Sequence, residues 1–449
     1  MKRNLQQLAQ WLSEEAVGEA EVTGVAIDTR VVKQGDLFIP FKGERVNGHQ
    51  FVQQAVDAGA SAILWQRSEP NPPPYIPYIL VDDTETALQQ LARKYRDGHM
   101  AKFIGITGSN GKTSTKDIVA SLLTPFFKVQ KTQGNFNNQL GLPITLLNLD
   151  EDTEVAVLEM GMSGFGEIEF LTTLARPHMA IITNIGEAHM QDLGSRAGIA
   201  KAKYEIVEGL ANDGVLFYDG DEPLLRELVT TKAYAFGHNA NNDLCVNTII
   251  SSATGSTFTT TGRIEGEFFI SVLGEHQVKN TLSAMLVAHQ LGLTSEQIKA
   301  ALQSVVLTDM RMQLVQGAND VQFINDAYNA APSSVKAAIQ FMKKTTIRPK
   351  KWLVLADMLE LGDEELAFHA NLANDIKATD FEYVLLYGPR MHALYTALQN
   401  EFTTERLIYR AEHLADLTAT VKQYADADTL VLIKGSRGMQ LEQIITACQ

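Results

Sequence analysis

The sequence predicts an α/β protein built from three domains. Its 449 residues exceed the roughly 250–300 residues that one hydrophobic core usually organises. From residue 102 onward, short β-rich runs alternate with amphipathic helical stretches, which is the pattern of parallel sheets covered by helices. A Thr- and Ile-rich stretch over 244–272 interrupts this alternation, and a second strand–helix series follows residue 311. These changes place the domains at 1–99, 100–311 and 312–449.

We interpret residues 1–99 as a small mixed α/β domain. The amphipathic stretch Thr84–Arg96 predicts a helix. The proline-rich stretch from Pro70 to Pro77 would suit a linker, but a strand-like run follows it at once, so we expect a surface loop inside the domain. Three strand-like pieces complete this domain, at Asp36–Phe41, Ala62–Trp65 and Tyr78–Val81.

The central domain is predicted to hold a parallel sheet with an antiparallel appendage over 244–272, and the third domain a Rossmann-like α/β fold. Central strands are expected in FIGIT, VAVLEM, MAIITNI and GVLFYD, and helices at Lys112–Leu123, Ile168–Ala175, Ala197–Leu210, Asn280–Leu291 and Ser295–Ser304. In the third domain, strands are expected in VQFIND, KWLVLAD, YVLLYG and TLVLIKG, and helices at Ser333–Met342 and Glu364–Lys377.

The composition indicates a cytoplasmic protein, which we expect to be a monomer. A net charge of −15 argues against a broad surface for nucleic acid or for an anionic membrane, because clustered Lys and Arg hold those partners. The two cysteines, Cys245 and Cys448, form neither a disulfide framework nor a thiolate metal motif. The first residues are polar and amphipathic, and no run of about 18 apolar residues occurs, so we expect neither a signal peptide nor a membrane span.

The strongest local motif is a phosphate-binding loop, GITGSNGKT at 105–113, between a predicted strand and a predicted helix. Gly108 and Gly111 let backbone N–H groups surround phosphate oxygens, and the helix N-terminus adds a positive dipole. Lys112 would neutralise the terminal phosphates, and Thr113 would ligate Mg²⁺. The motif predicts a nucleoside-triphosphate site in a P-loop ATPase-like domain, although Ile106 replaces the first glycine of the Walker A pattern. A glycine-rich turn with an exposed lysine is the less favoured interpretation.

Two side chains at strand ends are candidate metal ligands. Glu159 follows one predicted strand and His189 the next, and open α/β sheets bind ligands at the carboxyl ends of their strands. Singly, each is more often a helix-capping glutamate or a hydrogen-bonded loop histidine; together, downstream of a phosphate loop, they indicate function. Lys201 and Lys203 lie on the next predicted helix and point to different faces, so at most one can face the site. Physical reasoning alone favours a solvated lysine pair.

Several motifs in consecutive order resemble the Mur ligase family, and within it the enzymes that join D-alanyl-D-alanine to UDP-N-acetylmuramoyl-tripeptide. The resemblance covers essentially the whole chain. It implies an ATP-dependent, ADP-forming ligase that acts through an acyl phosphate in peptidoglycan synthesis, and domain closure around the substrates. The motifs are VAIDTR (25–30), GDLFIPFKGERVNGHQF (35–51), TGSNGKTSTK (107–116), GNFNNQLGLP (134–143), LEMGM (158–162), HQVKN (276–280), NDAYNAAPSS (325–334), DMLELG (357–362) and KGSRGM (434–439).

The resemblance also assigns roles to individual residues. Lys112, Asn138, Glu159, His189 and Lys203 would form the catalytic centre, with Thr113, Glu159, His189 and a carbamylated Lys203 around Mg²⁺. ATP would contact Gly108, Ser109, Asn110, Gly111, Lys112, Thr113, Ser114, His276, Asn280, Arg311, Asp326, Tyr328 and Asn329. The other substrates would contact Thr29, Arg30, Lys42, Gly43, Arg45, His49, Asn135, Asn137, Lys434, Ser436 and Arg437.

Other classes of enzyme share some of these motifs, and two residues of the chain differ from the family pattern. The amino-acid-adding ligases of the family share the first-domain motifs but typically carry DYAHTPD and DNPR, which are absent here, and folylpolyglutamate synthases lack the first domain. A P-loop ATPase that couples hydrolysis to a partner would usually end the second strand in Asp rather than Glu159. Gln277 and Gly438 depart from the family pattern, which usually has Asn and Ser at these positions.

Overall fold

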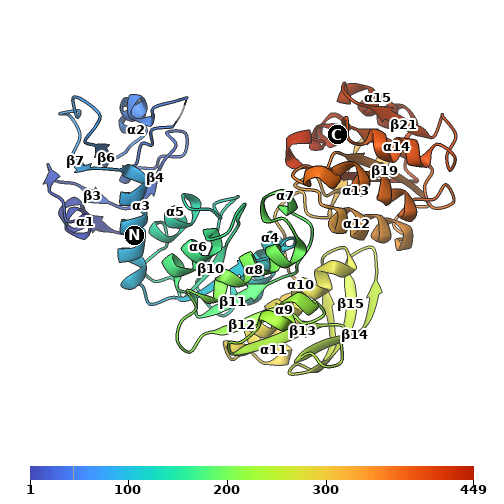
Figure 1. The fold of residues 1–449 in the computed structure, drawn as a ribbon, viewed down its shortest axis with the longest axis horizontal. Coiled ribbons are helices and arrows are strands. Elements are labelled where there is room, and N and C mark those ends of the chain that lie inside the picture. Colours follow the sequence, from blue (N-terminus) through green and yellow to red (C-terminus); the bar gives the residue numbers. More distant parts are fainter. Residues whose placement is uncertain (44) are drawn as a thin grey trace.

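A computed structural model describes residues 1–43 and 45–449 of the chain. In this structure, the first and third domains lie on the same side of the central domain, one at each end of it (Figure 1). The parallel-dominated sheets confirm the predicted α/β fold class. Across the described ranges, no helix is both long and apolar enough to cross a membrane.

The first domain contains a five-stranded sheet in the order β2-β7-β6-β5-β4, in which only β2 runs antiparallel to its neighbour. The prolines from Pro70 to Pro77 form a loop between β6 and β7, as predicted. The expected strand at 36–41 is shorter and ends at Phe38. The elements are β1 (Arg3–Asn4), α1 (Leu5–Leu12), β2 (Ala16–Val17), β3 (Glu21–Val22), β4 (Gly24–Ala26), β5 (Asp36–Phe38), α2 (Val52–Asp57), β6 (Ala62–Gln66), β7 (Tyr78–Val81) and α3 (Thr84–Asp97).

The central domain is organised by one nine-stranded sheet, in the order β16-β15-β14-β13-β12-β11-β8-β10-β9. Strands β8 to β14 are parallel, whereas β14, β15 and β16 are antiparallel, so the predicted appendage continues the sheet instead of forming a separate one. The strands are β8 (Lys102–Thr107), β9 (Val129–Lys131), β10 (Val155–Glu159), β11 (Met179–Ile182), β12 (Val215–Asp219), β13 (Ala233–Gly237), β14 (Leu244–Ser251), β15 (Ser256–Gly262) and β16 (Gly266–Ile270).

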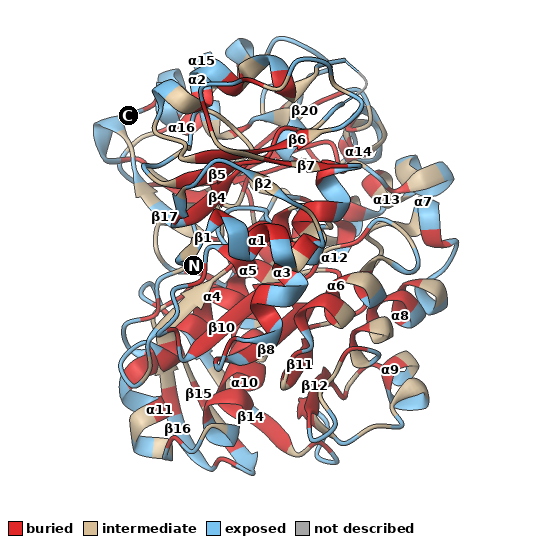
Figure 2. Cartoon of the chain, turned by 90° about the vertical axis from the view of Figure 1, so that its left-hand side faces the viewer, coloured by how far each residue is buried: buried red, intermediate tan, exposed pale blue. Residues whose placement is uncertain are grey.

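Helices bury both faces of the parallel part of this sheet, and its central strands are almost wholly buried (Figure 2). The predicted helix at 280–291 begins five residues earlier, at Glu275, which brings the residues of the HQVKN motif onto a helix. The helices are α4 (Lys112–Leu123), α5 (Gly141–Leu147), α6 (Glu167–Ala175), α7 (Met190–Leu193), α8 (Arg196–Tyr204), α9 (Pro223–Leu228), α10 (Glu275–Gln290) and α11 (Ser295–Leu302).

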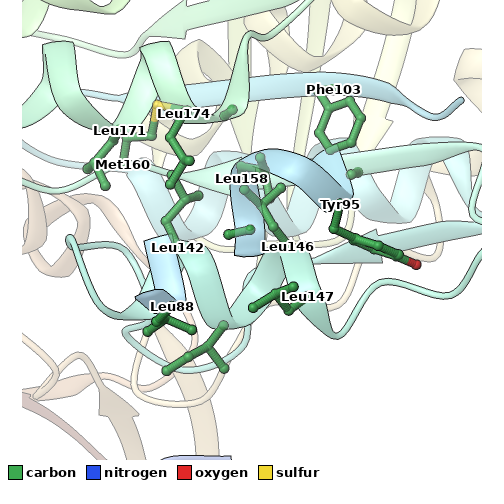
Figure 3. Close-up of a cluster of buried hydrophobic side chains, with 14 of the residues drawn as sticks. Leu88, Tyr95, Phe103, Leu142, Leu146, Leu147, Leu158, Met160, Leu171 and Leu174 are labelled. Atoms are coloured by element: carbon green, nitrogen blue, oxygen red, sulfur yellow. The ribbon is translucent and has the colours of Figure 1, made fainter. Parts of the chain in front are cut away.

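The hydrophobic core of the central domain continues into the first domain. Leu88 and Tyr95 of α3 lie in one buried cluster with Leu142 and Leu146 of α5 and with Leu158 of β10 (Figure 3). Helix α3 therefore packs against the central domain as well as against its own sheet. The predicted boundary at residue 99 stays a prediction, and the core is continuous across it.

The third domain has its own cores and a six-stranded sheet in the order β17-β18-β22-β19-β20-β21, antiparallel only at β17. The helix predicted at 364–377 is α-helical only to Asn371 and continues as a 3₁₀ turn to Asp375. The elements are β17 (Gln313–Gln316), β18 (Gln322–Asn325), α12 (Pro332–Lys344), β19 (Lys350–Ala356), α13 (Glu365–Asn371), β20 (Tyr383–Tyr387), α14 (His392–Leu398), β21 (Leu407–Arg410), α15 (Leu414–Tyr424), β22 (Thr429–Lys434) and α16 (Glu442–Ala447).

Candidate active site

The phosphate loop connects the buried strand β8 to helix α4, as the motif predicts. Gly108 (φ +149°) and Gly111 (φ +80°) adopt backbone conformations that side chains disfavour. The end of the neighbouring strand β11 braces the loop, since the Asn184 carbonyl accepts a hydrogen bond from Ser109 N at 3.0 Å and the Asn184 side chain accepts one from Asn110 N at 3.0 Å. Lys112 Nζ donates to the Gly108 carbonyl at 2.8 Å. The loop is thus held in shape before any phosphate arrives.

Substituting Gly108 by Ala is expected to weaken ATP binding about 100-fold, because φ is +149° there and the added Cβ would overlap the Thr183 hydroxyl. Isothermal titration with a non-hydrolysable ATP analogue measures the effect. Gly292→Ala is the matched control, since Gly292 also has a positive φ, of +90°, but a Cβ added there would meet no atom within 4 Å. Unchanged affinity in Gly108→Ala would contradict the role of this loop.

The carboxyl ends of β10 and β11 bring the predicted metal ligands toward Lys112. Glu159 is buried; its Oε1 accepts a hydrogen bond from Asn137 Nδ2 at 2.9 Å, and its Oε2 has no hydrogen-bond partner within the described residues. Burial, together with the charges of Lys112 and Lys203, lowers the pKa of His189 to about 4. His189 is therefore neutral at physiological pH, the form in which imidazole binds metals.

Lys203 is buried, with 1% of its surface exposed, whereas Lys201 on the same helix is exposed. The interpretation of a solvated lysine pair is therefore wrong for Lys203, because the helix turns this residue into the protein. Burial first, and the charge of Lys112 second, hold the pKa of Lys203 well below its usual value. No ion pair among the described residues includes Lys203. A buried amine with a lowered pKa fits carbamylation by CO₂, which needs the unprotonated form.

A resident metal would need more ligands than the unmodified side chains supply. Over residues 1–43 and 45–449, no group of three or more His, Cys, Asp or Glu side chains could hold a metal ion. The orphaned Glu159 Oε2 and the neutral His189 fit two ligand positions. A carbamate on Lys203 would add anionic oxygen ligands, so the residues fit Mg²⁺ better with this modification than without it.

Lys116 is a site residue that the sequence reasoning missed. It is almost fully buried, and its Nζ lies 3.8 Å from Glu159 Oε2. Burial lowers its pKa, and the neighbouring charges of Asp117 and then Glu159 raise it. Its position one helical turn after Lys112 was the available signal, because residues four apart share a helix face.

All the residues predicted to contact ATP except Gly108 line one cavity of about 190 Å³ between the central and third domains, which we call the nucleotide cavity. Arg311 Nη2 donates to Thr113 Oγ1 at 3.1 Å, and the guanidinium lies over the Tyr328 ring at 4.2 Å. Four buried polar atoms of the residues lining this cavity lack hydrogen-bond partners among the described residues, namely Ser109 Oγ, Glu159 Oε2, His276 Nδ1 and Arg311 Nε. The lining residues are Ser109, Asn110, Gly111, Lys112, Thr113, Ser114, Asn137, Glu159, His276, Gln277, Asn280, Arg311, Asp326, Tyr328, Asn329, Ser334 and Lys434.

Gln277, which departs from the family pattern, fills its position by bridging two helices. Its Nε2 donates to Ser114 Oγ on α4 at 3.4 Å, and its Oε1 accepts from Asn280 Nδ2 at 3.0 Å. Asn280 in turn lies close to Gly111, where a side chain would collide with it. Helix α10 is therefore fitted directly against the phosphate loop.

The third domain contributes to this cavity through the carboxyl ends of its strands. Lys434 is buried and pairs with Asp326 Oδ2 at 2.6 Å, and it also donates to the Asn329 carbonyl at 3.1 Å. Lys434, which the resemblance assigns to the substrates other than ATP, thus lies at the nucleotide cavity. Ser436 and Arg437 lie outside it; Ser436 Oγ accepts from Leu359 N at 3.0 Å, and Arg437 pairs with Glu442 at 2.5 Å.

The three asparagines of the GNFNNQ motif lie in different environments. Asn137 contacts Glu159, whereas the side chain of Asn138 accepts hydrogen bonds from Leu140 N at 3.2 Å and Gly141 N at 2.9 Å at the start of α5. Asn135 is exposed. The structure therefore brings Asn137, rather than Asn138, to the predicted metal ligand, and a catalytic role of Asn138 stays a prediction.

The predicted sugar-nucleotide residues lie in the first domain, and none of those described lines the nucleotide cavity. Arg30 pairs with Asp28, Lys42 pairs with Glu69 at 2.9 Å, and Thr29 Oγ1 donates to Gln54 at 3.4 Å. His49 is buried and hydrogen-bonded at both ring nitrogens, to Asn47 and to Gln66 N. Two further predicted residues complete the set: Gly43, whose N–H donates to Val46 O at 3.0 Å, and the exposed Arg45.

Comparisons with known proteins cover all three domains. Three family models match, described as the Mur ligase family catalytic domain (residues 21–96), the Mur ligase middle domain (106–288) and the Mur ligase glutamate ligase domain (310–437). The chain is 46% identical to the UDP-N-acetylmuramoyl-tripeptide–D-alanyl-D-alanine ligase of Bacillus subtilis strain 168, over 99% of the chain and 98% of the relative. The Escherichia coli K12 protein of the same name is 34% identical, over 99% and 98%.

Solved structures agree over the same length. A crystal structure of MurF from Acinetobacter baumannii has a TM-score of 0.87 at 30% identity, and covers 99% of this chain and 98% of its own. MurF ligase from Thermotoga maritima in complex with ADP has a TM-score of 0.83 at 26% identity, and covers 95% and 97%.

Proposed function

This chain is a member of the Mur ligase family, and on that basis we propose that it joins D-alanyl-D-alanine to UDP-N-acetylmuramoyl-tripeptide with the conversion of ATP to ADP. The observation that carries the proposal is the cavity between two domains, where a braced phosphate loop meets Arg311, Asp326 and Lys434. The named relatives favour this reaction over that of the amino-acid-adding ligases and over a mechanical ATPase.

The reaction needs an activated acyl group, because oxide is too poor a leaving group for an amine to displace from a carboxylate. The terminal carboxylate of the tripeptide attacks the γ-phosphorus of ATP, and an acyl phosphate and ADP form. The amine of the dipeptide then attacks the acyl carbon, and inorganic phosphate leaves. ATP use agrees with the ADP complex of the Thermotoga maritima relative.

Within the chain, Lys112 and Arg311 reduce the repulsion between the tripeptide carboxylate and the triphosphate. Both lie at the nucleotide cavity, and Arg311 is fixed by its contacts with Thr113 and Tyr328. Cations that are already in place when charge develops stabilise the transition state without further reorganisation. The partnerless His276 Nδ1 is available to the nucleotide.

We propose Mg²⁺ and a Lys203 carbamate as further parts of this site. Glu159 and His189, with Thr113 and the carbamate, would hold the ion, which would neutralise phosphate charge during transfer. Lys116 would place a positive charge beside the metal ligand, since its Nζ lies 3.8 Å from Glu159 Oε2. We also propose that the chain acts as a monomer in the cytoplasm.

The first-domain cations are already paired with carboxylates before the sugar nucleotide binds. Arg30 pairs with Asp28 and Lys42 with Glu69, so a diphosphate would have to displace these carboxylates or bind beside them. Water screens both pairs, since the Arg30 and Lys42 side chains are exposed, so neither pair adds much stability. Exchange of a carboxylate for a phosphate therefore requires little free energy.

The test of the proposed function is phosphate release from ATP in the presence of UDP-N-acetylmuramoyl-tripeptide, with and without D-alanyl-D-alanine. Strong dependence of the rate on both acceptors supports the ligase. Equal phosphate release without either acceptor would show an ATPase and would overturn the proposal. Mass spectrometry of the product identifies the new amide.

A further inference from the structure

A carboxylate of the third domain reaches the predicted metal-binding histidine of the central domain. Glu360 lies in the turn after β19, and its Oε2 is 3.6 Å from His189 Nδ1. Gly362 of the same turn lies close to Gln191, beside His189. This turn of the third domain therefore lies against the segment of the central domain that carries His189.

Two backbone N–H groups at the start of this turn are held by hydrogen bonds to side chains of other segments. Met358 N donates to His369 Nε2 at 2.9 Å, and Leu359 N donates to Ser436 Oγ at 3.0 Å. Glu360 itself has φ +64°, and His189 opposite has φ +65°. Non-glycine residues occupy this region rarely, and they do so where the surrounding structure fixes them. The direction in which Glu360 leaves the turn is thus determined by the fold.

Glu360 differs from the other carboxylates around this turn. Asp357 is buried and accepts a hydrogen bond from Met391 N at 2.9 Å, and Glu365 pairs with Arg390 at 2.5 Å. The side chain of Glu360 is 72% exposed, and within the described residues no Lys or Arg pairs with it; its one ion-pair-range neighbour is the neutral His189 ring. It is therefore available to a ligand.

The negative charge of Glu360 distinguishes between anionic and cationic groups of the substrates. ATP and the reacting carboxylate of the tripeptide are anions, and a carboxylate beside the reaction centre repels both. The amine of the dipeptide is mainly an ammonium at neutral pH, since an α-amino group has a pKa of about 7.7–8.0. A carboxylate at this position therefore favours a cationic group over an anionic one.

We propose that Glu360 binds the ammonium group of the incoming D-alanyl-D-alanine and places its nitrogen beside the reaction centre. The inference rests on the ligase function proposed above. The third domain then carries the amine into the site when it closes on the central domain, and Ser436, which is hydrogen-bonded to the same turn, lies next to the bound dipeptide. The amine loses its proton only after it has been positioned.

The variant Glu360→Gln tests this inference, because it removes the charge and keeps the shape. We expect the KM for D-alanyl-D-alanine to rise about 30-fold, as expected for loss of a charge-assisted hydrogen bond, and the KM values for ATP and for the UDP-tripeptide to stay within twofold. Trapping of the acyl phosphate by hydroxylamine, a small neutral nucleophile, should proceed at the wild-type rate. Glu364→Gln, an exposed carboxylate in the same segment, is the control and should behave as wild type.

Any other outcome of these measurements would refute either the role of Glu360 or the proposed ligase function. An unchanged KM for the dipeptide, in an enzyme whose wild type depends on both acceptors, would refute the role of Glu360 and leave the ligase function standing. A rise confined to the KM for the UDP-tripeptide would assign Glu360 to an amino group of that substrate, and would also refute the proposal. Absence of acceptor-dependent turnover in the wild type would instead refute the proposed function itself.

Discussion

Replacing Lys112 by Met is expected to lower kcat/KM of the ligation by about three orders of magnitude, or ~4 kcal/mol of transition-state stabilisation. Lys112 is the cation of the phosphate loop, its ammonium already lies within the loop at 2.8 Å from the Gly108 carbonyl, and methionine keeps the volume without the charge. Burial lowers the pKa of Lys112, and the charge of Glu159 raises it. Bound triphosphate would raise it further and keep the ammonium charged.

Steady-state phosphate release with both acceptors present measures this loss. Lys102→Met is the matched control, because Lys102 starts the same strand β8 at its opposite, exposed end and should leave activity unchanged. Far- and near-ultraviolet circular dichroism checks that the variants fold. A Lys112→Met enzyme that retains more than about a tenth of wild-type activity would be incompatible with the proposed role.

Replacing Lys203 by Ala is expected to reduce kcat about 100-fold or more, since a carbamate ligand of Mg²⁺ would be lost. Burial lowers the pKa of Lys203 and so raises the share of unprotonated amine, which is the form that CO₂ modifies. Removal of CO₂ and bicarbonate should therefore lower wild-type activity reversibly. The readout is the return of activity when bicarbonate is added back.

Chemical rescue distinguishes a carbamate from a structural amine. Acetate or formate should restore part of the activity of Lys203→Ala, because a small carboxylate can occupy the cavity that the side chain leaves. Lys201→Ala is the control on the same helix; its side chain is exposed, so neither loss nor rescue is expected. Full activity of Lys203→Ala in the absence of added carboxylate would refute the carbamate.

Most of the fold could be predicted because strand and helix periods are local properties of the sequence. Helix α4 begins and ends at the predicted residues, and the parallel strands of the central sheet follow the apolar runs. The start of α10 was predicted five residues late, because Glu275–Lys279 carries little helical periodicity and is held by contacts with α4. The antiparallel strands β14 to β16 were predicted from the sequence. The pairing of β14 with β13 was not, because no local sequence pattern encodes it.

The candidate site, like the fold, could be predicted only in part. Glycine and lysine spacing located the phosphate loop, and strand ends located Glu159 and His189. The burial of Lys203 could not be predicted, since it depends on how α8 packs, and Lys116 was overlooked although its spacing from Lys112 was visible. Neither the pairing of Arg30 and Lys42 with carboxylates nor the contact between Glu360 and His189 has a sequence signal, because each joins residues that only the fold brings together.

The buried cluster that joins α3 to α5 and β10 has a mechanical consequence. Because the first and central domains share one core, bending between them would expose leucines to water. Of the described central-domain residues, only Leu273 belongs to a third-domain core cluster, and the two domains also meet through polar contacts such as Asn110–Ser333 and Lys344–Glu275. If the domains close on the substrates, we therefore expect the first two domains to move as one body relative to the third. An inhibitor wedged between these bodies would block their closure without having to resemble any substrate.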